Sequence, residues 1–293
     1  MAKSPIITIA FPVYNGERFM RESLDALLAQ DLTDFELVIN DNASTDGTQA
    51  IAEELCARDS RIRYNRQPEN LGARDNFEQV VWTARGKYFI WASCHDLWAP
   101  SLLRRCVETM EQDDSVALCF SRAAEIDADG NRLGTLRGKL DTRGMDRIAR
   151  FKKTMLRVAG YAVYGVHRTA VLRRVMPLEI MFGPDIKLMA ELSFHGAFAY
   201  LPEELFFHRR LSVSRNWRRY FSNLKMTYHW WRMFELFADM VCTHLAMIRQ
   251  YTDKPSQRVH LSAWSVLIQL KRTAAWGVAL VTSLFFRRYY RPW

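Results

Sequence analysis

The sequence predicts an α/β fold with a Rossmann-like, mostly parallel sheet, followed by a helical C-terminal extension. Short apolar runs rich in β-branched residues alternate with segments of helical periodicity over residues 6–120. This alternation is typical of consecutive βαβ units and a parallel sheet. A polar loop follows each of the first four strand-like runs. From Trp217 onward the strand-like runs stop and helical patterns continue.

The expected elements follow one another at the spacing of βαβ units. Strands are expected at residues 6–11, 35–39, 62–64, 87–92 and 116–120, and helices at residues 17–30, 48–56, 73–84 and 100–112. Further along, the pattern indicates a hairpin or insertion at 124–134, a strand at 161–168, a helix at 185–194 and a strand at 197–207 interrupted by Pro-Glu-Glu. We therefore expect an α/β domain at residues 1–215 and a helical extension at residues 216–293.

Composition and cysteine usage indicate a globular cytoplasmic protein. Hydrophobic residues make up 49% of the 293 residues and charged residues 25%, which is ordinary for a folded chain. The five cysteines are scattered without a Cys-x-x-Cys pair, so neither a disulfide scaffold nor a zinc site is expected. The N-terminus lacks the apolar core of a signal peptide. The longest apolar run, Thr273 to Phe286, is shorter than the roughly 20 residues that span a bilayer.

The net charge of +9 is concentrated near the C-terminus. Residues 209–293 contain fifteen Lys or Arg against three acids, and residues 217–293 hold six of the nine tryptophans. Basic and aromatic residues around an apolar helix favour peripheral contact with the inner face of the cytoplasmic membrane. The alternatives are a helical subdomain packed on the α/β domain and an oligomer interface. Nucleic-acid binding is disfavoured because no recognition motif accompanies the charge.

Four polar loops, at residues 12–17, 40–48, 70–76 and 93–98, follow the first four expected strands. Because ligands bind at the carboxyl ends of parallel strands, these loops are expected to form one site. Asp41 is suited to accept a hydrogen bond from a base or a ribose, and Arg74 to bind a diphosphate. His95 and Asp96 are suited to hold a divalent cation. Each motif alone also fits a structural role; the loop at 40–48, for example, is a plausible helix cap through Ser44 or Asp46.

The order and spacing of these loops resemble family 2 glycosyltransferases, whose fold is called GT-A. The resemblance covers roughly residues 5–215 and implies a nucleotide-sugar donor, with Asp41 on the nucleobase. The matching positions are Pro12, Tyr14 and Asn15, followed by Glu17; Asp41 to Thr48; and Asn70 and Gly72, followed by Arg74.

Downstream segments extend the resemblance to the acceptor side. Tyr164 to Arg168 is similar to the segment that flanks the acceptor, and Phe182-Gly183-Pro184-Asp185 to the segment with the catalytic base. The resemblance thus assigns the base to Asp185 and implies a single displacement with inversion; an N-cap role is the alternative for Asp185. The charge of the leaving diphosphate would be offset by a cation, by His95, or by Arg209 and Arg210.

One position departs from the family pattern. The family usually has Asp-x-Asp-Asp at the metal site, whereas this chain has Ser93-Cys94-His95-Asp96. Histidine suits Mn²⁺ better than Mg²⁺. Either His95 and Asp96 bind a divalent cation, Mn²⁺ or Mg²⁺, or a cationic His95 meets the diphosphate directly.

The expected activity is transfer of a sugar from a nucleoside-diphosphate donor to a hydroxyl of a glycan or lipid-linked acceptor, in polysaccharide or cell-surface glycan synthesis. The alternative is a decayed donor-binding or scaffolding relative, suggested by Ser93 and His95. The retained Asp41, Asp96 and Asp185 argue against decay. A nucleotidyltransferase would require a loop rich in Gly, Arg and Lys after the first strand, which residues 12–17 do not provide.

Overall fold

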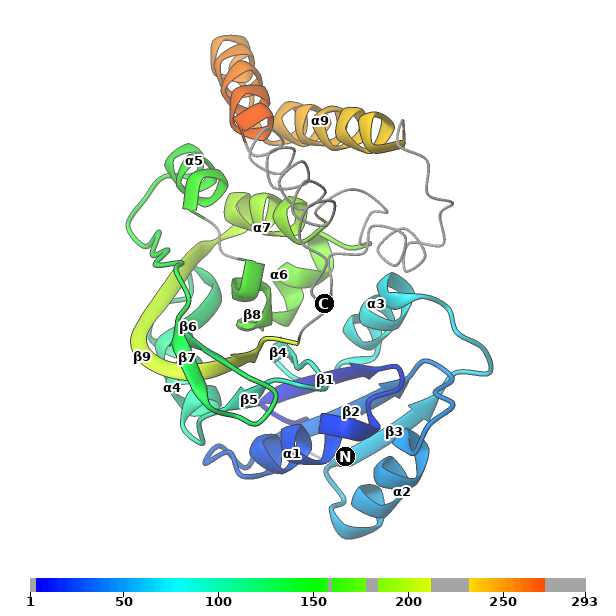
Figure 1. Cartoon of the computed structure of the whole chain (residues 1–293). Helices are drawn as coiled ribbons and strands as arrows, with labels where there is room; N and C mark the ends of the chain where they lie inside the picture. Colours follow the sequence, from blue (N-terminus) through cyan, green and yellow to red (C-terminus); the bar gives the residue numbers. More distant parts are fainter. Residues whose placement is uncertain (1–3, 158–159, 178–183, 212–231, 272–293) are drawn as a thin grey trace, which may run out of the picture. The chain divides into compact units, whose positions relative to one another are not determined.

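The computed structural model describes residues 4–157, 160–177, 184–211 and 232–271. They belong to two compact units, one containing the residues up to 211 and the other residues 232–271 (Figure 1). The expected extension is thus only partly described, and most of its tryptophans lie outside the described residues.

The first unit is built on one mixed sheet of nine strands. Its order is β3-β2-β1-β4-β8-β6-β9-β5, and β7 pairs with β6. The strands are β1 (Ile7–Val13), β2 (Phe35–Asp41), β3 (Ile62–Arg66), β4 (Tyr88–Trp91), β5 (Leu97–Trp98), β6 (Val116–Ile126), β7 (Arg132–Thr135), β8 (Val166–Arg168) and β9 (Ala197–Arg209).

Helices connect these strands and cover the sheet. They are α1 (Glu17–Leu28), α2 (Thr48–Arg58), α3 (Ala73–Thr83), α4 (Leu102–Gln112), α5 (Arg147–Arg157), the 3₁₀-helix η1 (Gly160–Tyr164), α6 (Thr169–Arg174) and α7 (Pro184–His195). In Figure 1, α1 and α2 lie on one face of the parallel strands and α3 lies on the other.

The α/β class and the parallel arrangement of the first four strands are confirmed. β1 pairs in parallel with β2 and β4, and β2 with β3. Every residue of β1, β2 and β4 is buried, as expected for strands covered on both faces. β8 is antiparallel to both β4 and β6, so β6 runs in the direction of β4. β9 is parallel to β6, and its carboxyl end therefore lies at the same edge as those of β1 to β4.

Two predicted elements differ from the structure. Residues 160–164 form η1 instead of the first half of a strand, because Tyr161 packs edge-on against Phe120 and turns the chain before β8. Pro202 to Glu204 do not interrupt the last strand: β9 is continuous, and its register against β6 shifts near Arg122. The amphipathic helix α5 was not predicted.

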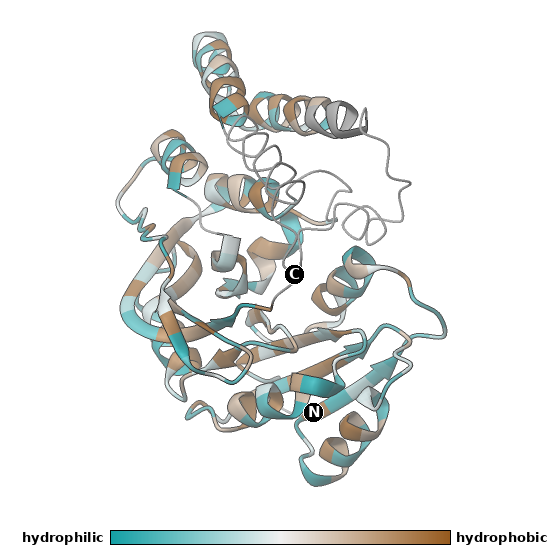
Figure 2. Cartoon of the chain, viewed as in Figure 1, coloured by the Kyte–Doolittle hydropathy of each residue, from teal (hydrophilic) through white to brown (hydrophobic). Residues whose placement is uncertain are grey.

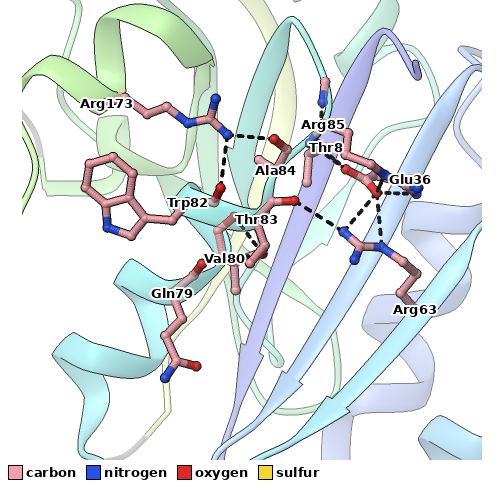
Figure 3. Close-up of polar contacts among 11 residues, drawn as sticks. Thr8, Glu36, Arg63, Gln79, Val80, Trp82, Thr83, Ala84, Arg85 and Arg173 are labelled. Carbon is pink, nitrogen blue, oxygen red and sulfur yellow. Dashed lines mark hydrogen bonds and ion pairs between the residues drawn. The ribbon is translucent and has the colours of Figure 1, made fainter. Parts of the chain in front are cut away.

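The opposite edge of the parallel strands is closed by buried polar contacts (Figure 3). The Glu36 carboxylate accepts hydrogen bonds from the Thr8 hydroxyl at 2.6 Å and from the Arg85 and Arg63 side chains at 2.7 and 3.1 Å. Burial by itself would raise the pKa of Glu36, but these bonds and charges outweigh it and lower that pKa. Arg173 donates to the backbone carbonyls of residues 81, 82 and 84 at the end of α3. This edge is therefore occupied by structural contacts.

The second unit consists of α9 (Arg232–Tyr251) and a helical segment at residues 255–271. Its buried side chains include Met240, Met247, Ile248 and Leu261. Figure 2 shows hydrophilic and hydrophobic residues mixed along both helices. Across the described residues, every helix is either too short or too polar to span a membrane.

Candidate functional site

The loops after β1 and β2 are held together by reciprocal hydrogen bonds. The Asn15 backbone N–H donates to the Ser44 hydroxyl at 2.9 Å, and the Thr45 N–H donates to Asn15 Oδ1 at 2.8 Å. The Gly47 N–H donates to Glu17 Oε2 at 3.0 Å. Asn15 has φ of 51°, in the left-handed region that Asn tolerates better than most residues. Asn15 and Glu17 are therefore used to shape the loops, while the Tyr14 side chain is 48% exposed beside them.

The loop after β3 joins them through Asn42, a residue that the sequence did not single out. Asn42 Nδ2 donates to Asn70 Oδ1 at 2.9 Å, and the Leu71 N–H donates to Asn42 Oδ1 at 2.8 Å. Gly72, with φ of 89°, then turns the chain into α3. Arg74 lies in the first turn of α3, where its guanidinium is 2.5 Å from Asp75.

Asp41 lies beneath these loops, without solvent exposure. Its Oδ1 accepts the Ser44 N–H at 2.8 Å, and its Oδ2 accepts the Tyr64 hydroxyl at 2.7 Å, with Arg66 Nε at 3.5 Å. Burial and the Asp41 carboxylate raise the pKa of Tyr64, which remains the donor of this bond. Pro12 is buried in β1 opposite Asn40. A nucleobase N–H that contacts Asp41 therefore shares the carboxylate with Ser44 and Tyr64, using one of its remaining lone pairs.

The loop after β4 places a buried carboxylate between two imidazoles. Asp96 Oδ1 accepts the Arg209 backbone N–H at 2.8 Å. His208 Nδ1 lies 3.2 Å and His95 Nε2 3.9 Å from the same oxygen. Asp96 Oδ2 is also buried and has no hydrogen-bond partner among the described residues. This cluster joins the ends of β4 and β9.

The two imidazoles have opposite pKa shifts. The Asp96 carboxylate, 3.2 Å from Nδ1, raises the pKa of His208 and outweighs the opposite effect of burial. Burial lowers the pKa of His95, outweighing the attraction of Asp96. Protonation of the pair is therefore favoured on His208, which the sequence analysis did not name. The sequence did contain a signal for His208. It lies at the carboxyl end of a predicted strand, and ligands bind at the carboxyl ends of parallel strands.

The Arg209 side chain is used for structural hydrogen bonds within the protein. Its guanidinium is 1% exposed and donates to the carbonyls of His95, Asp127 and Ala128 at 2.7–3.1 Å. It also donates to Glu22 at 2.7 Å. The predicted direct contact of Arg209 with a diphosphate does not fit this geometry, because the group faces protein on all sides. Arg210 is different: its side chain is 60% exposed and lies 3.3 Å from Glu125.

Asp185 lies in the first turn of α7, directly after Pro184. A Cβ on Gly160 of η1 would lie 3.6 Å from Asp185 Oδ2, so η1 packs against the predicted base. Phe182 and Gly183, which belong to the same motif, lie outside the described residues.

The described residues contain no cluster of three or more His, Cys, Asp or Glu suited to a metal ion. The unpartnered Asp96 Oδ2 is nevertheless a candidate ligand, and the His95 imidazole lies near it, with Nε2 3.9 Å from the other Asp96 oxygen and Nδ1 3.0 Å from the Ser93 hydroxyl. A divalent cation held by one carboxylate usually takes its remaining ligands from substrate phosphates. The donor set therefore fits a cation that is bound together with a nucleotide.

The fold and the site together define a GT-A type of structure. S. aureus TarS (residues 1–349, solved in complex with UDP-GlcNAc) is similar, with a TM-score of 0.69 and 15% identity over 90% of this chain and 72% of that one. The mannosyltransferase PcManGT from Pyrobaculum calidifontis, solved with GDP-Man and Mn²⁺, matches with a TM-score of 0.56 and 16% identity over 99% and 82% of the two chains.

Comparison of the sequence with protein-family models identifies the family of this chain. The Glycosyl transferase family 2 model matches residues 8–181, and the chain belongs to this family. Chondroitin synthase from Escherichia coli is 29% identical over 131 residues, which are 45% of this chain and 19% of that protein. The chain spans less than half the length of this and other curated relatives it matches.

Proposed function

We propose that this chain transfers a sugar from a nucleoside-diphosphate donor to a hydroxyl of an acceptor, with inversion at the anomeric carbon. The observation that supports this most strongly is the buried Asp96, flanked by His95 and His208 at the edge where the four loops meet. Family membership supports the same activity.

In this mechanism Asp185 accepts the proton of the acceptor hydroxyl as its oxygen attacks the anomeric carbon. The nucleoside diphosphate leaves, and its charge is met by His208, Arg74 and Arg210. Arg209 acts indirectly, by fixing the backbone around Asp96. A bound divalent cation, held by His95 and Asp96, would supply further charge neutralisation on the diphosphate.

The relatives suggest the donor and acceptor classes. UDP-GlcNAc and GDP-Man appear in the two similar structures, and chondroitin synthase is a polymer-forming relative. We therefore propose a UDP- or GDP-linked hexose as donor and a glycan or lipid-linked acceptor, in polysaccharide or cell-surface glycan synthesis.

A donor-hydrolysis assay tests this function. Purified protein is incubated with a panel of UDP- and GDP-sugars, and release of the nucleoside diphosphate is measured beside the Asp185→Asn variant. Slow hydrolysis of one donor, lost in the variant, is expected. Binding of a donor without hydrolysis or transfer to any glycan acceptor would favour the decayed relative that Ser93 and His95 suggest.

Removal of the Asp41 carboxylate is expected to weaken nucleotide binding. Asp41→Ala should cost roughly 1–3 kcal/mol of binding, the value of a charged hydrogen bond. Tyr64→Phe is the matched variant: it frees Asp41 Oδ2, so nucleotide affinity should stay the same or increase. Isothermal calorimetry with UDP and GDP measures both. Unchanged nucleotide binding in a folded Asp41→Ala protein would contradict the assignment.

Cation binding is expected to depend on the nucleotide. With only two protein donors, Mn²⁺ should bind weakly alone and more tightly when UDP or GDP is present, and Mn²⁺ should be preferred to Mg²⁺ because of His95. Mn²⁺ electron paramagnetic resonance, with and without nucleotide, measures this. An activity that strictly requires Mg²⁺ and rejects Mn²⁺ would be inconsistent with the proposed ligands.

We also propose peripheral membrane contact through residues 217–293. The twelve Lys and Arg residues between positions 217 and 293 support attraction to anionic lipid. Deletion beyond Tyr251 is expected to release the protein from anionic vesicles in co-sedimentation at low salt. Full-length protein that ignores such vesicles would exclude this contact.

A further inference from the structure

Tyr164 connects the two halves of the proposed site. It is the last residue of η1, whose first residue, Gly160, packs beside Asp185. The Tyr164 ring lies 6.1 Å, centroid to centroid, from Phe206, and the Phe206 ring lies 6.3 Å from that of His208. His208 in turn faces Asp96. A path of packed side chains thus leads from the Asp185 side through Tyr164 to the Asp96 cluster.

The Tyr164 hydroxyl is unused by the protein. Its ring is partly buried in the hydrophobic core, yet the hydroxyl has no hydrogen-bond partner among the described residues. A buried tyrosine hydroxyl normally finds a protein partner. The Tyr164 hydroxyl is not among the buried unpartnered side-chain atoms of the described residues, so it is accessible to a ligand. Tyr161, on the same 3₁₀-helix, follows this rule and donates to the Gly138 carbonyl at 3.4 Å.

The surroundings define what this hydroxyl is able to bind. Burial, followed by the negative charges of Asp96 and Asp185, holds the pKa of Tyr164 well above its usual value. The group is therefore a permanent hydrogen-bond donor. The Asp96 and Asp185 carboxylates are able to accept hydrogen bonds from a neutral polyol. A sugar hydroxyl, which donates to a carboxylate and accepts from a phenol, suits both requirements.

We propose that Tyr164 donates a hydrogen bond to a hydroxyl of the transferred sugar and so orients the sugar ring between the Asp96 cluster and Asp185. This inference rests on the proposed function. It has Tyr164 contact the sugar of the donor and make no contact with the nucleotide. Its loss is therefore expected to affect nucleotide sugars and to leave free nucleoside diphosphates unaffected.

Tyr164→Phe tests this inference, because it removes the hydroxyl and keeps the ring that packs against Phe206. Calorimetry is performed with UDP, UDP-GlcNAc, GDP and GDP-mannose. The variant should bind the sugar nucleotide about 5- to 50-fold more weakly than wild type and the matching diphosphate equally well. Tyr161→Phe, from the same 3₁₀-helix, is the matched control and should bind all ligands as wild type does.

Deoxy-sugar donors sharpen the test. A donor that lacks the contacted hydroxyl should bind wild type more weakly and should show no further loss in Tyr164→Phe. A Tyr164→Phe protein that binds the intact sugar nucleotide as tightly as wild type overturns the inference and leaves the proposed function standing. A wild-type protein that binds none of the four ligands overturns the proposed function, and the role of Tyr164 with it.

Discussion

Asp185→Asn is expected to lower kcat by about 10²- to 10⁴-fold, the usual contribution of a general base. The substitution keeps the shape of the side chain and its ability to cap α7, but the amide does not accept the acceptor's proton. Donor affinity should stay near the wild-type value, because in the proposed mechanism Asp185 contacts the acceptor hydroxyl. Steady-state kinetics together with donor calorimetry separate the two effects.

Glu191→Gln provides the comparison on the same helix. Glu191 lies 2.5 Å from Lys187 and has no assigned role in the reaction, so kcat should change little. An Asp185→Asn enzyme that keeps most of its kcat would reduce Asp185 to a helix cap. The base would then be sought at Asp96, or at Glu191 if Glu191→Gln had lowered kcat instead.

Arg209→Met is expected to lower the free energy of unfolding by about 3–5 kcal/mol. Methionine keeps much of the apolar stem but removes the donor to three partly buried carbonyls and leaves Glu22 without this partner. Each buried acceptor left unsatisfied costs about 1–3 kcal/mol. Urea denaturation followed by circular dichroism measures the change.

Arg210→Met is the neighbouring control. This side chain is largely exposed, and a surface ion pair such as Arg210–Glu125 contributes only about 0–1 kcal/mol. If Arg209→Met were as stable as Arg210→Met and instead lost nucleotide affinity, the guanidinium would be contacting the donor, as the sequence suggested.

The sequence predicted the parallel half of the fold well, because there the signals are local. A β-branched run, a polar loop and an amphipathic helix each carry their own periodicity, and the loops at 12–17 and 40–48 do meet at one edge. The prediction failed where tertiary packing decides the outcome. Tyr161 and Tyr164 read as strand residues, yet their packing partners Phe120 and Phe206 are distant in sequence.

Side-chain roles were harder to predict than positions. Arg209 and His208 are adjacent in sequence, and both are polar residues at a strand end. Only the structure distinguishes them: Arg209 is enclosed by four protein acceptors, whereas His208 faces the Asp96 carboxylate. Asn42 was passed over because an amide between two better-known motif positions carries no signal of its own, although it ties two loops together.

The continuous strand β9 runs from the end of α7 to the residues beside Asp96. It begins two residues after α7, the helix of Asp185, and ends at Arg209, beside His208. At about 3.3 Å per residue, its 13 residues form a strand roughly 40 Å long. Its register against β6 shifts near Val116 and on both sides of Arg122. Because a one-residue slip would turn every side chain to the opposite face, the pairing of β9 with β6 sets on which face of the sheet the His208 side chain lies.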